Sequence, residues 1–354
     1  MKVRNRSLAL LALASLAWSC AGASDNDSEK DVGGHAGDVA VRPPPRDATG
    51  AGGSAGATAS DRLDAGEAAP VHDTGNSPDA PAPPTTSMLP DAGRASDGAA
   101  SERPGWTLAW SDEFDQPTCP SPNNWAFERG FVRNEEAQWY QPDNASCVDG
   151  VLVIEARREN KPNPNYAAGS DDWKRNRPSI SYTSTSLKSA GKQAFTYGRF
   201  EVRARIDTRA GSWPAFWTVG EGAWPGAGEI DVMEFYNGTV LANVCLPMGS
   251  SCDWSSTRQT LASLGGTTWA SAFHVWAMEW DAQNIDLLLD EVRVLHIAVA
   301  KAIGSAKVNP YLDKPQVMIL NQAVGGSNGG DPSHTSFPLR YEVDYVRVYQ
   351  KSVR

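Results

Sequence analysis

The stretch Glu229-Ile230-Asp231-Val232-Met233-Glu234 brings three carboxyl groups into six residues of strand-forming sequence. Side chains two residues apart on a β-strand share a face, so Glu229 and Asp231 point the same way and the aliphatic residues beside them point into a core. Strict alternation would then bury Glu234 without a partner, which is costly in free energy. One extra residue, a β-bulge, resets the alternation and returns Glu234 to the face of the other acids. The run therefore predicts a bulged strand with three acids in a row.

Three neighbouring carboxyl groups are suited to cleaving a glycosidic bond, because crowding separates their pKa values. Glu229 can stay ionised and attack the anomeric carbon of a sugar, while Glu234 stays protonated and donates to the leaving oxygen. Asp231 can hydrogen-bond to the nucleophile. Carboxyl groups about 5–5.5 Å apart predict retention of configuration through a covalent glycosyl-enzyme. The alternative, three solvated surface acids, is disfavoured because like charges on one strand face repel each other.

Tryptophans are frequent just before the acids. Trp213 and Trp217 share a strand face by their spacing, and Trp224 follows a few residues later. Aromatic faces pack against the C–H faces of sugar rings, so tryptophans beside acids indicate a groove for a glycan. Core packing is the alternative for each tryptophan, and for Phe216 and Trp276 the two alternatives are equally open. We expect Trp213, Trp217 and Trp224 to be exposed in the groove.

Period-two strand patterns recur through the C-terminal part of the chain, separated by Gly, Pro, Asn and Asp clusters. The predicted strands are 150–157, 183–187, 197–206, 213–219, 229–236, 274–280, 285–289, 316–322 and 342–349. A short helix is expected only near 299–303. Many short strands in one domain predict an all-β antiparallel sandwich or barrel, and a curved sandwich can carry a concave substrate cleft.

The first 23 residues resemble an export signal. A basic start is followed by an apolar run at 8–18 that is too short to span a bilayer permanently. Two processing routes stay open, which are cleavage after Ala23 and lipidation of Cys20 in a lipoprotein-like box. Both routes predict a bacterial protein that is secreted or held at the cell surface or outer membrane.

The next segment has a different composition from the rest of the chain. Residues 21–103 contain no Phe, Trp or Tyr and carry 14 acidic against 6 basic side chains. Such a segment cannot bury enough apolar surface to offset the entropy lost on ordering. We therefore predict a disordered linker at 24–103 and a globular domain at 104–354, which holds twelve of the thirteen tryptophans.

The globular domain carries 28 acidic and 23 basic side chains without a Lys/Arg-rich stripe, so nucleic acid is not an expected partner. Its four cysteines suggest two disulfides in an exported protein. Three connectivities are open, and we favour Cys119–Cys147 with Cys245–Cys252 because each pair closes a short loop. A monomer is the default expectation.

Residues 106–349 resemble glycoside hydrolase family 16, in its laminarinase-like group. The core of the resemblance is the run 229–234, which is similar to the family's bulged E-x-D-x-x-E signature. Supporting stretches are WSDEF at 110–114, NEEAQWY at 134–140, YGRFE at 197–201, WPAFW at 213–217, NQAVGG at 321–326 and VDYVRVY at 343–349.

This resemblance implies a β-jelly-roll sandwich with an open cleft, acting on β-1,3 or β-1,4 linkages of glucans or galactans without a cofactor for catalysis. It assigns Glu229 as nucleophile, Asp231 as helper and Glu234 as acid/base. The positions that it matches to the sugar nearest the cut are Asn134, Trp213 and Trp217, with Arg199 and Gln322 as further matches.

The resemblance also implies a structural calcium ion on the convex side of the sandwich. The carboxylate of Asp344 matches one ligand of that ion, in company with backbone oxygens near Glu113, and oxygen ligands suit Ca²⁺. An ordinary surface acid is the alternative for Asp344.

One stretch departs from the family pattern. Many laminarinase-like members carry a histidine on the strand after the acids, whereas 242–247 reads ANVCLP. The substrate therefore stays open between a β-1,3 or mixed-linkage β-glucan, which is the leading hypothesis, and a galactan or agar-type polymer. A transglycosylase and a non-catalytic glycan-binding protein are further alternatives, the second disfavoured by the presence of all three acids.

Overall fold

The computed structural model describes residues 103–305 and 308–352. These residues lie within one compact unit of the chain. The predicted signal segment at 1–23 with Cys20, and the predicted linker at 24–103 except for Arg103, lie outside the described residues.

Two β-sheets make up the described part of the chain. The ten-stranded sheet has the order β15 (Val292–Ala298), β14 (Asn284–Leu289), β13 (His274–Trp280), β8 (Gly198–Ile206), β17 (Leu339–Lys351), β5 (Val151–Pro162), β6 (Ser179–Ser184) and β3 (Gln138–Tyr140), with β1 (Trp106–Asp112) on β17 and β4 (Ala145–Val148) on β5. The seven-stranded sheet has the order β12 (Ser251–Thr260), β11 (Thr239–Met248), β10 (Glu229–Tyr236), β9 (Ser212–Gly220), β16 (Gln316–Val324), β7 (Ser186–Lys188) and β2 (Ala126–Phe127).

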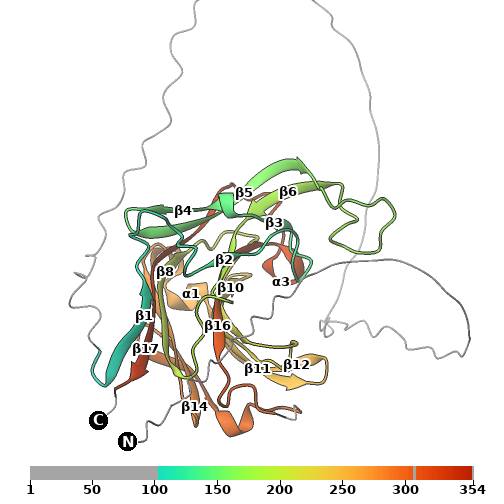
Figure 1. Ribbon diagram of the computed structural model, residues 1–354. Coiled ribbons are helices and arrows are strands. Elements are labelled where there is room, and N and C mark those ends of the chain that lie inside the picture. The colour runs from blue at the N-terminus through green and yellow to red at the C-terminus, as the bar shows by residue number, and fades with distance from the viewer. Residues whose placement is uncertain (1–102, 306–307, 353–354) are drawn as a thin grey trace, which may run out of the picture. The chain divides into compact units, whose positions relative to one another are not determined.

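Nearly all of these strand pairs are antiparallel, with β3 and β6 as the parallel exception. In Figure 1, β10, β11, β12 and β16 of the smaller sheet lie to one side of β1, β8, β14 and β17 of the larger sheet. The predicted all-β antiparallel sandwich is confirmed.

Helices are short in this structure. They are η1 (Pro142–Asn144), α1 (Leu261–Leu264), α2 (Gly266–Ala270), η2 (Val299–Lys301) and α3 (Gly326–Gly329). The helix expected near 299–303 is present as the 3-10 turn η2. Among the described residues, no helix combines the length and apolar character needed to cross a membrane.

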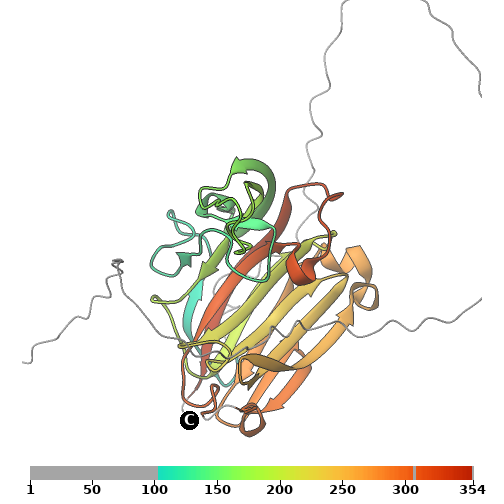
Figure 2. The same cartoon turned by 90° about the vertical axis from the view of Figure 1, so that its right-hand side faces the viewer.

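One large hydrophobic cluster holds the two sheets together. Phe200 and Val202 of β8 meet Ile230 of β10 and Met318 and Leu320 of β16 in this cluster. Because side chains alternate between the two faces of a sheet, the residues between these core positions point to the opposite face of the seven-stranded sheet. Figure 2 looks onto this sheet, with the red-orange β16 alongside the yellow-green β9 and the yellow β10 on the far side of β9.

Both favoured disulfides are present. Cys119 is joined to Cys147 of β4, and Cys245 of β11 is joined to Cys252 of β12. The second bond ties together the two strands that follow the acid-bearing strand β10. The predicted pairing is therefore confirmed.

Candidate active site

Strand β10 contains the predicted bulge. Asp231 and Met233 lie opposite consecutive residues of β9, and the register with β11 shifts over the same part of the strand. Val232 and Met233 are both buried in the hydrophobic cluster. Two consecutive side chains thus point inward, and Glu234 returns to the face occupied by Glu229 and Asp231.

Each outer glutamate of this face accepts a hydrogen bond from an indole. The Trp224 Nε1 donates to Glu229 Oε2 at 2.5 Å, and the Trp213 Nε1 donates to Glu234 Oε1 at 2.9 Å. An N–H donated to a carboxylate stabilises its ionised form and fixes the direction of its oxygens. The two tryptophans therefore orient the two glutamates.

Asn243 of β11 connects two of the acids, Asp231 and Glu234. It lies opposite Asp231 across the β10–β11 pair. Its Nδ2 donates to Asp231 Oδ2 at 3.0 Å and to Glu234 Oε2 at 2.9 Å. One amide thus holds the middle and the last acid of the motif in a fixed relation.

The three acids differ in their pKa values. Burial raises the pKa of Glu234 to about 7, and the negative charges of Glu229 and Glu136 act in the same direction. Burial, followed by the charges of Glu234 and Glu229, raises the pKa of Asp231 well above its usual range. Burial also raises the pKa of Glu229, but the nearby Arg133 charge and two hydrogen bonds oppose the rise. Near neutral pH, Glu229 is therefore the acid whose ionised form has the most support, while Glu234 lies close to its titration midpoint.

Tyr311 supports the backbone at the first residue of β10. Its hydroxyl accepts a hydrogen bond from the Glu229 amide at 3.1 Å and lies 3.0 Å from the Glu229 carbonyl and 2.5 Å from the Cys245 carbonyl. The side chain is fully buried. A phenol from a distant part of the chain therefore bridges β10 and β11 next to Glu229.

A second set of polar residues continues from the acids across β9 and β16. The Trp217 Nε1 donates to Asn321 Oδ1 at 2.7 Å, and Asn321 Nδ2 donates to Tyr140 Oη at 3.1 Å. The Arg133 guanidinium lies 5.1 Å from the Trp217 ring centroid and forms an ion pair with Glu128. Trp217 is half-buried and faces Asp231 across the β9–β10 pair.

Asn134 joins this set through Glu136. Its exposed amide lies 3.4 Å from Glu136 Oε1, and buried Glu136 accepts a 2.7 Å hydrogen bond from Gln138 Nε2. The structure thus places Trp217 and Trp224 beside the acids and connects Asn134 to this set through Glu136, and the binding of a sugar by these residues stays a prediction. Trp224 is 50% exposed, which leaves its ring free to contact a ligand.

Two predicted sugar contacts on the same sheet need correction. Trp213 is buried, at 4% exposure, and packs edge-on against Tyr236, so its expected exposure in the groove was wrong. Gln322 is fully buried and donates to Ser212 Oγ at 3.0 Å. Strand alternation gives the outward position to its neighbour Asn321 instead.

Arg199 lies in the other sheet, on β8, and does not join the acids. Its guanidinium is buried, at 1% exposure, and forms 2.7 Å ion pairs with Glu201, Glu279 and Glu291. The prediction that Arg199 holds the sugar was therefore wrong, because three carboxylates already occupy its donors on a different sheet. Phe216 and Trp276, for which core packing was one alternative, both belong to the hydrophobic cluster.

The residues expected around a calcium ion do not fit one. The Asp344 carboxylate is paired with the Arg203 guanidinium at 2.6 Å, and Glu113 is paired with Arg347 at 2.7 Å. A positive side chain at the one expected carboxylate ligand opposes a divalent cation. Within 103–305 and 308–352, no group of three or more His, Cys, Asp or Glu side chains could hold a metal.

Sequence reasoning missed several residues that surround the acids, namely Arg133, Glu136, Asn243, Tyr311 and Asn321. A signal for Asn243 exists in the Asn237-Gly238 pair, which is typical of a two-residue hairpin turn. Pairing the residues of the two strands outward from that turn, with one bulge in β10, places Asn243 opposite Asp231, as the register shows. For Tyr311 the sequence offers no local signal.

Paired glutamates of unequal pKa, set on one face of a β-sandwich and flanked by tryptophans, define a glycoside hydrolase that works through its own carboxyl groups. The comparisons with known proteins agree with this class. The chain belongs to glycosyl hydrolases family 16, whose sequence pattern matches residues 134–347. Hydrolases of this family need no cofactor for catalysis.

Several relatives of known name support the assignment. A β-glucanase from Rhodothermus marinus is 35% identical over 70% of this chain and 86% of its own length. A keratan-sulfate endo-1,4-β-galactosidase from Sphingobacterium multivorum is 30% identical over 69% of this chain but only 55% of its own length. Among solved structures, the endo-β-1,3-glucanase from Pyrococcus furiosus shares 33% identity with a TM-score of 0.61, covering 70% of this chain and 96% of its own.

Proposed function

We propose that the protein is a retaining endo-β-glycosidase that hydrolyses an extracellular β-glucan, with β-1,3 or mixed linkages, by double displacement. The observation that supports it most directly is the placement of Glu229 and Glu234 on one face of a single bulged strand, with Asp231 between them. Carboxyl groups about 5–5.5 Å apart leave no room for a water between nucleophile and sugar, and the proposed retention requires this spacing between Glu229 and Glu234.

In the first step the Glu229 carboxylate attacks the anomeric carbon, and a covalent glycosyl ester forms as the bond to the leaving oxygen breaks. Protonated Glu234 gives its proton to that oxygen. The pKa of about 7 at Glu234 suits this role, because the group is largely protonated in mildly acidic solution and still about half protonated at neutral pH.

In the second step Glu234, now ionised, takes a proton from a water molecule whose oxygen attacks the same carbon. The ester bond to Glu229 breaks, and the sugar is released with its original configuration. Asp231, whose pKa lies well above its usual range, stays protonated and can donate to the departing Glu229 carboxylate. Asn243 keeps Asp231 and Glu234 aligned through both steps.

The choice of a β-glucan as substrate rests on relatives that are named for this activity, the β-glucanase and the endo-β-1,3-glucanase. A galactan or agar-type polymer is the second candidate. It is favoured by the similarity to a protein named as an endo-1,4-β-galactosidase.

We also propose that the enzyme works outside the cytoplasm, either secreted or anchored to the outer surface by a lipid at Cys20. Two disulfides in the described domain support an oxidising compartment. Fractionation of the producing cells should find the wild-type protein in the medium or the membrane. Finding it in the cytoplasm with free thiols would contradict this proposal.

The activity is tested with the protein and its Glu229→Gln variant on laminarin, mixed-linkage β-glucan, agarose, an unsulfated β-galactan and xyloglucan. We expect the wild type alone to shorten one β-glucan, with oligosaccharides of several lengths as products. Nuclear magnetic resonance of the first-formed products should show the β-anomer. Early α-anomer would refute the retaining mechanism, products longer than the substrate would indicate a transglycosylase, and tight binding without cleavage by both proteins would indicate a glycan-binding protein.

A further inference from the structure

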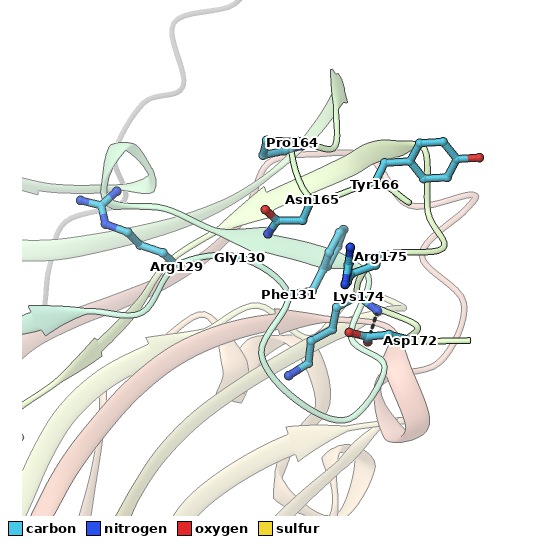
Figure 3. Close-up of a pocket in the computed structure, with 9 residues that line it drawn as sticks. All are labelled: Arg129, Gly130, Phe131, Pro164, Asn165, Tyr166, Asp172, Lys174 and Arg175. Carbon is cyan, nitrogen blue, oxygen red and sulfur yellow. Dashed lines mark hydrogen bonds between the residues drawn. The ribbon is translucent and has the colours of Figure 1, made fainter. Parts of the chain in front are cut away.

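A pocket of about 500 Å³ lies beside the far edge of the seven-stranded sheet, outside the acidic site. Two segments line it. Residues 129–131 follow the edge strand β2, and residues 164–175 belong to the long connection between β5 and β6. In Figure 3, Asn165 and Arg175 lie between Arg129 on one side and Tyr166 on the other.

The charge of this pocket is opposite to that of the protein. The chain has a formal net charge of −10, yet the pocket brings together Arg129, Lys174 and Arg175 against the single carboxylate of Asp172. One oxygen of Asp172 accepts a hydrogen bond from the Lys174 backbone amide at 2.9 Å. Within the described part of the chain, the guanidinium groups of Arg129 and Arg175 have no hydrogen-bond or ion-pair partner. Both groups are therefore free to bind a ligand.

The long connection is held in place by buried polar contacts. Asn163, which is 5% exposed, donates through Nδ2 to the carbonyls of Lys174 and Arg177 at 3.1 and 2.8 Å. Arg177 in turn donates to the carbonyls of Glu136 and Glu135 at 2.8 and 2.9 Å. The pocket is thus formed before any ligand arrives, which lowers the entropic cost of binding.

The same contacts connect the pocket to the acidic site. The Arg177 guanidinium lies 5.0 Å from the ring centroid of Phe131, a pocket residue, and two residues further along the chain Arg133 covers Trp217. Between β10 and β2 there are four strand spacings, on the order of 20 Å. A glycan that crosses the strands from the acids past Trp217 would reach this edge several sugars from the cut.

We propose that this pocket binds an anionic group of the glycan, a sulfate ester or a carboxylate, several sugars away from the cleaved bond. The free Arg175 guanidinium supplies planar paired donors that match such an oxyanion, while Lys174 beside it and Arg129 at the opposite side of the pocket add further positive charge (Figure 3). Tyr166, which is 47% exposed, offers a ring face to the sugar that carries the anion. This inference rests on the proposed glycosidase function and specifies which glycans it prefers.

The test measures binding separately from turnover. In the inactive Glu229→Gln background, dissociation constants are compared for one β-1,3-glucan oligosaccharide in neutral, sulfated and carboxymethylated forms. We expect at least one anionic form to bind about tenfold more tightly than the neutral form, and this preference to disappear in an Arg129→Gln/Arg175→Gln variant. Which anionic form is preferred identifies the group.

The matched control removes two exposed positive charges through Arg293→Gln/Lys301→Gln, at β15 of the other sheet and at the turn η2 that follows it. It should keep the preference in full. The pocket assignment is overturned if neither anionic form is preferred, or if both double variants lose the preference equally. If either of these results is found and the active protein still cleaves neutral glucan, the pocket proposal fails but the proposed glycosidase function stands. If the active protein neither binds nor cleaves any glycan, both proposals fail.

Discussion

The indole of Trp213 should set the upper pH limit of activity. In the proposed first step Glu234 must be protonated, so activity falls as the pH rises through its pKa of about 7. The Trp213 Nε1 donates to Glu234 Oε1 at 2.9 Å and favours the ionised form, so it lowers that pKa. Trp213→Phe removes the donor and should therefore move the alkaline limb of the pH profile upward.

The size of the effect follows from the hydrogen bond that is lost. A hydrogen bond to a charged group contributes about 1.5–3 kcal/mol, and about 1.4 kcal/mol corresponds to one pKa unit. Because water replaces part of the lost interaction, we expect the limb to move up by about one pH unit. The assay is kcat/KM on a soluble β-glucan across the neutral and alkaline range, which reports the free enzyme.

Trp106→Phe is the matched control, since Trp106 lies on β1 in the other sheet. That variant should keep the wild-type profile. The reasoning is refuted if folded Trp213→Phe keeps its alkaline limb in place or moves it to lower pH.

Three further predictions concern stability and rate. The folded state holds the Glu234 proton more tightly than the unfolded chain, so the contribution of Glu234 to stability is lost as the pH rises from about 4.5 to above 7. Glu234→Gln should therefore raise the free energy of unfolding by about 1–3 kcal/mol at about pH 8 but not at about pH 4. Urea denaturation at both pH values checks this, and an equal gain at both would contradict it. Asn243→Ala removes the donor shared by Asp231 and Glu234 and should lower kcat about 10–100-fold with little change in KM, so steady-state kinetics with an unchanged kcat would speak against the bridge. Replacing both Cys245 and Cys252 by Ser opens a loop with a sequence separation of 7 and should lower the free energy of unfolding by about 2–3 kcal/mol, whereas an unmoved denaturation midpoint would show that the hairpin does not depend on the bond.

The strands that the sequence predicts well are those with one clearly apolar face. Strands β10 and β13 match the predicted 229–236 and 274–280 at both ends. Strand β12 was missed because its ten residues are exposed or half-buried and largely polar, so its pairing with β11 leaves no hydrophobic period in the sequence. Strand β11 was missed for the opposite reason, since six consecutive residues within it are buried and alternation is hidden.

The acids of the site were predictable because they are neighbours on one strand, and a bulge was the one way to place all three together. The residues around them depend on the phase of other strands. Gln322 and Asn321 differ by one position, and that step decides which of them faces Trp217. Arg199 stands in a family-like stretch whose strand lies in the opposite sheet, which local sequence does not reveal.

The bulge in β10 also has a genetic consequence. A one-residue deletion inside a strand normally turns every following side chain to the opposite face. Here Val232 and Met233 both point into the core, so losing the codon for Met233 would restore plain alternation and leave Glu229, Asp231 and Glu234 on the same face. At this one position of the strand, evolution can insert or delete a residue while all three acids stay on the same face.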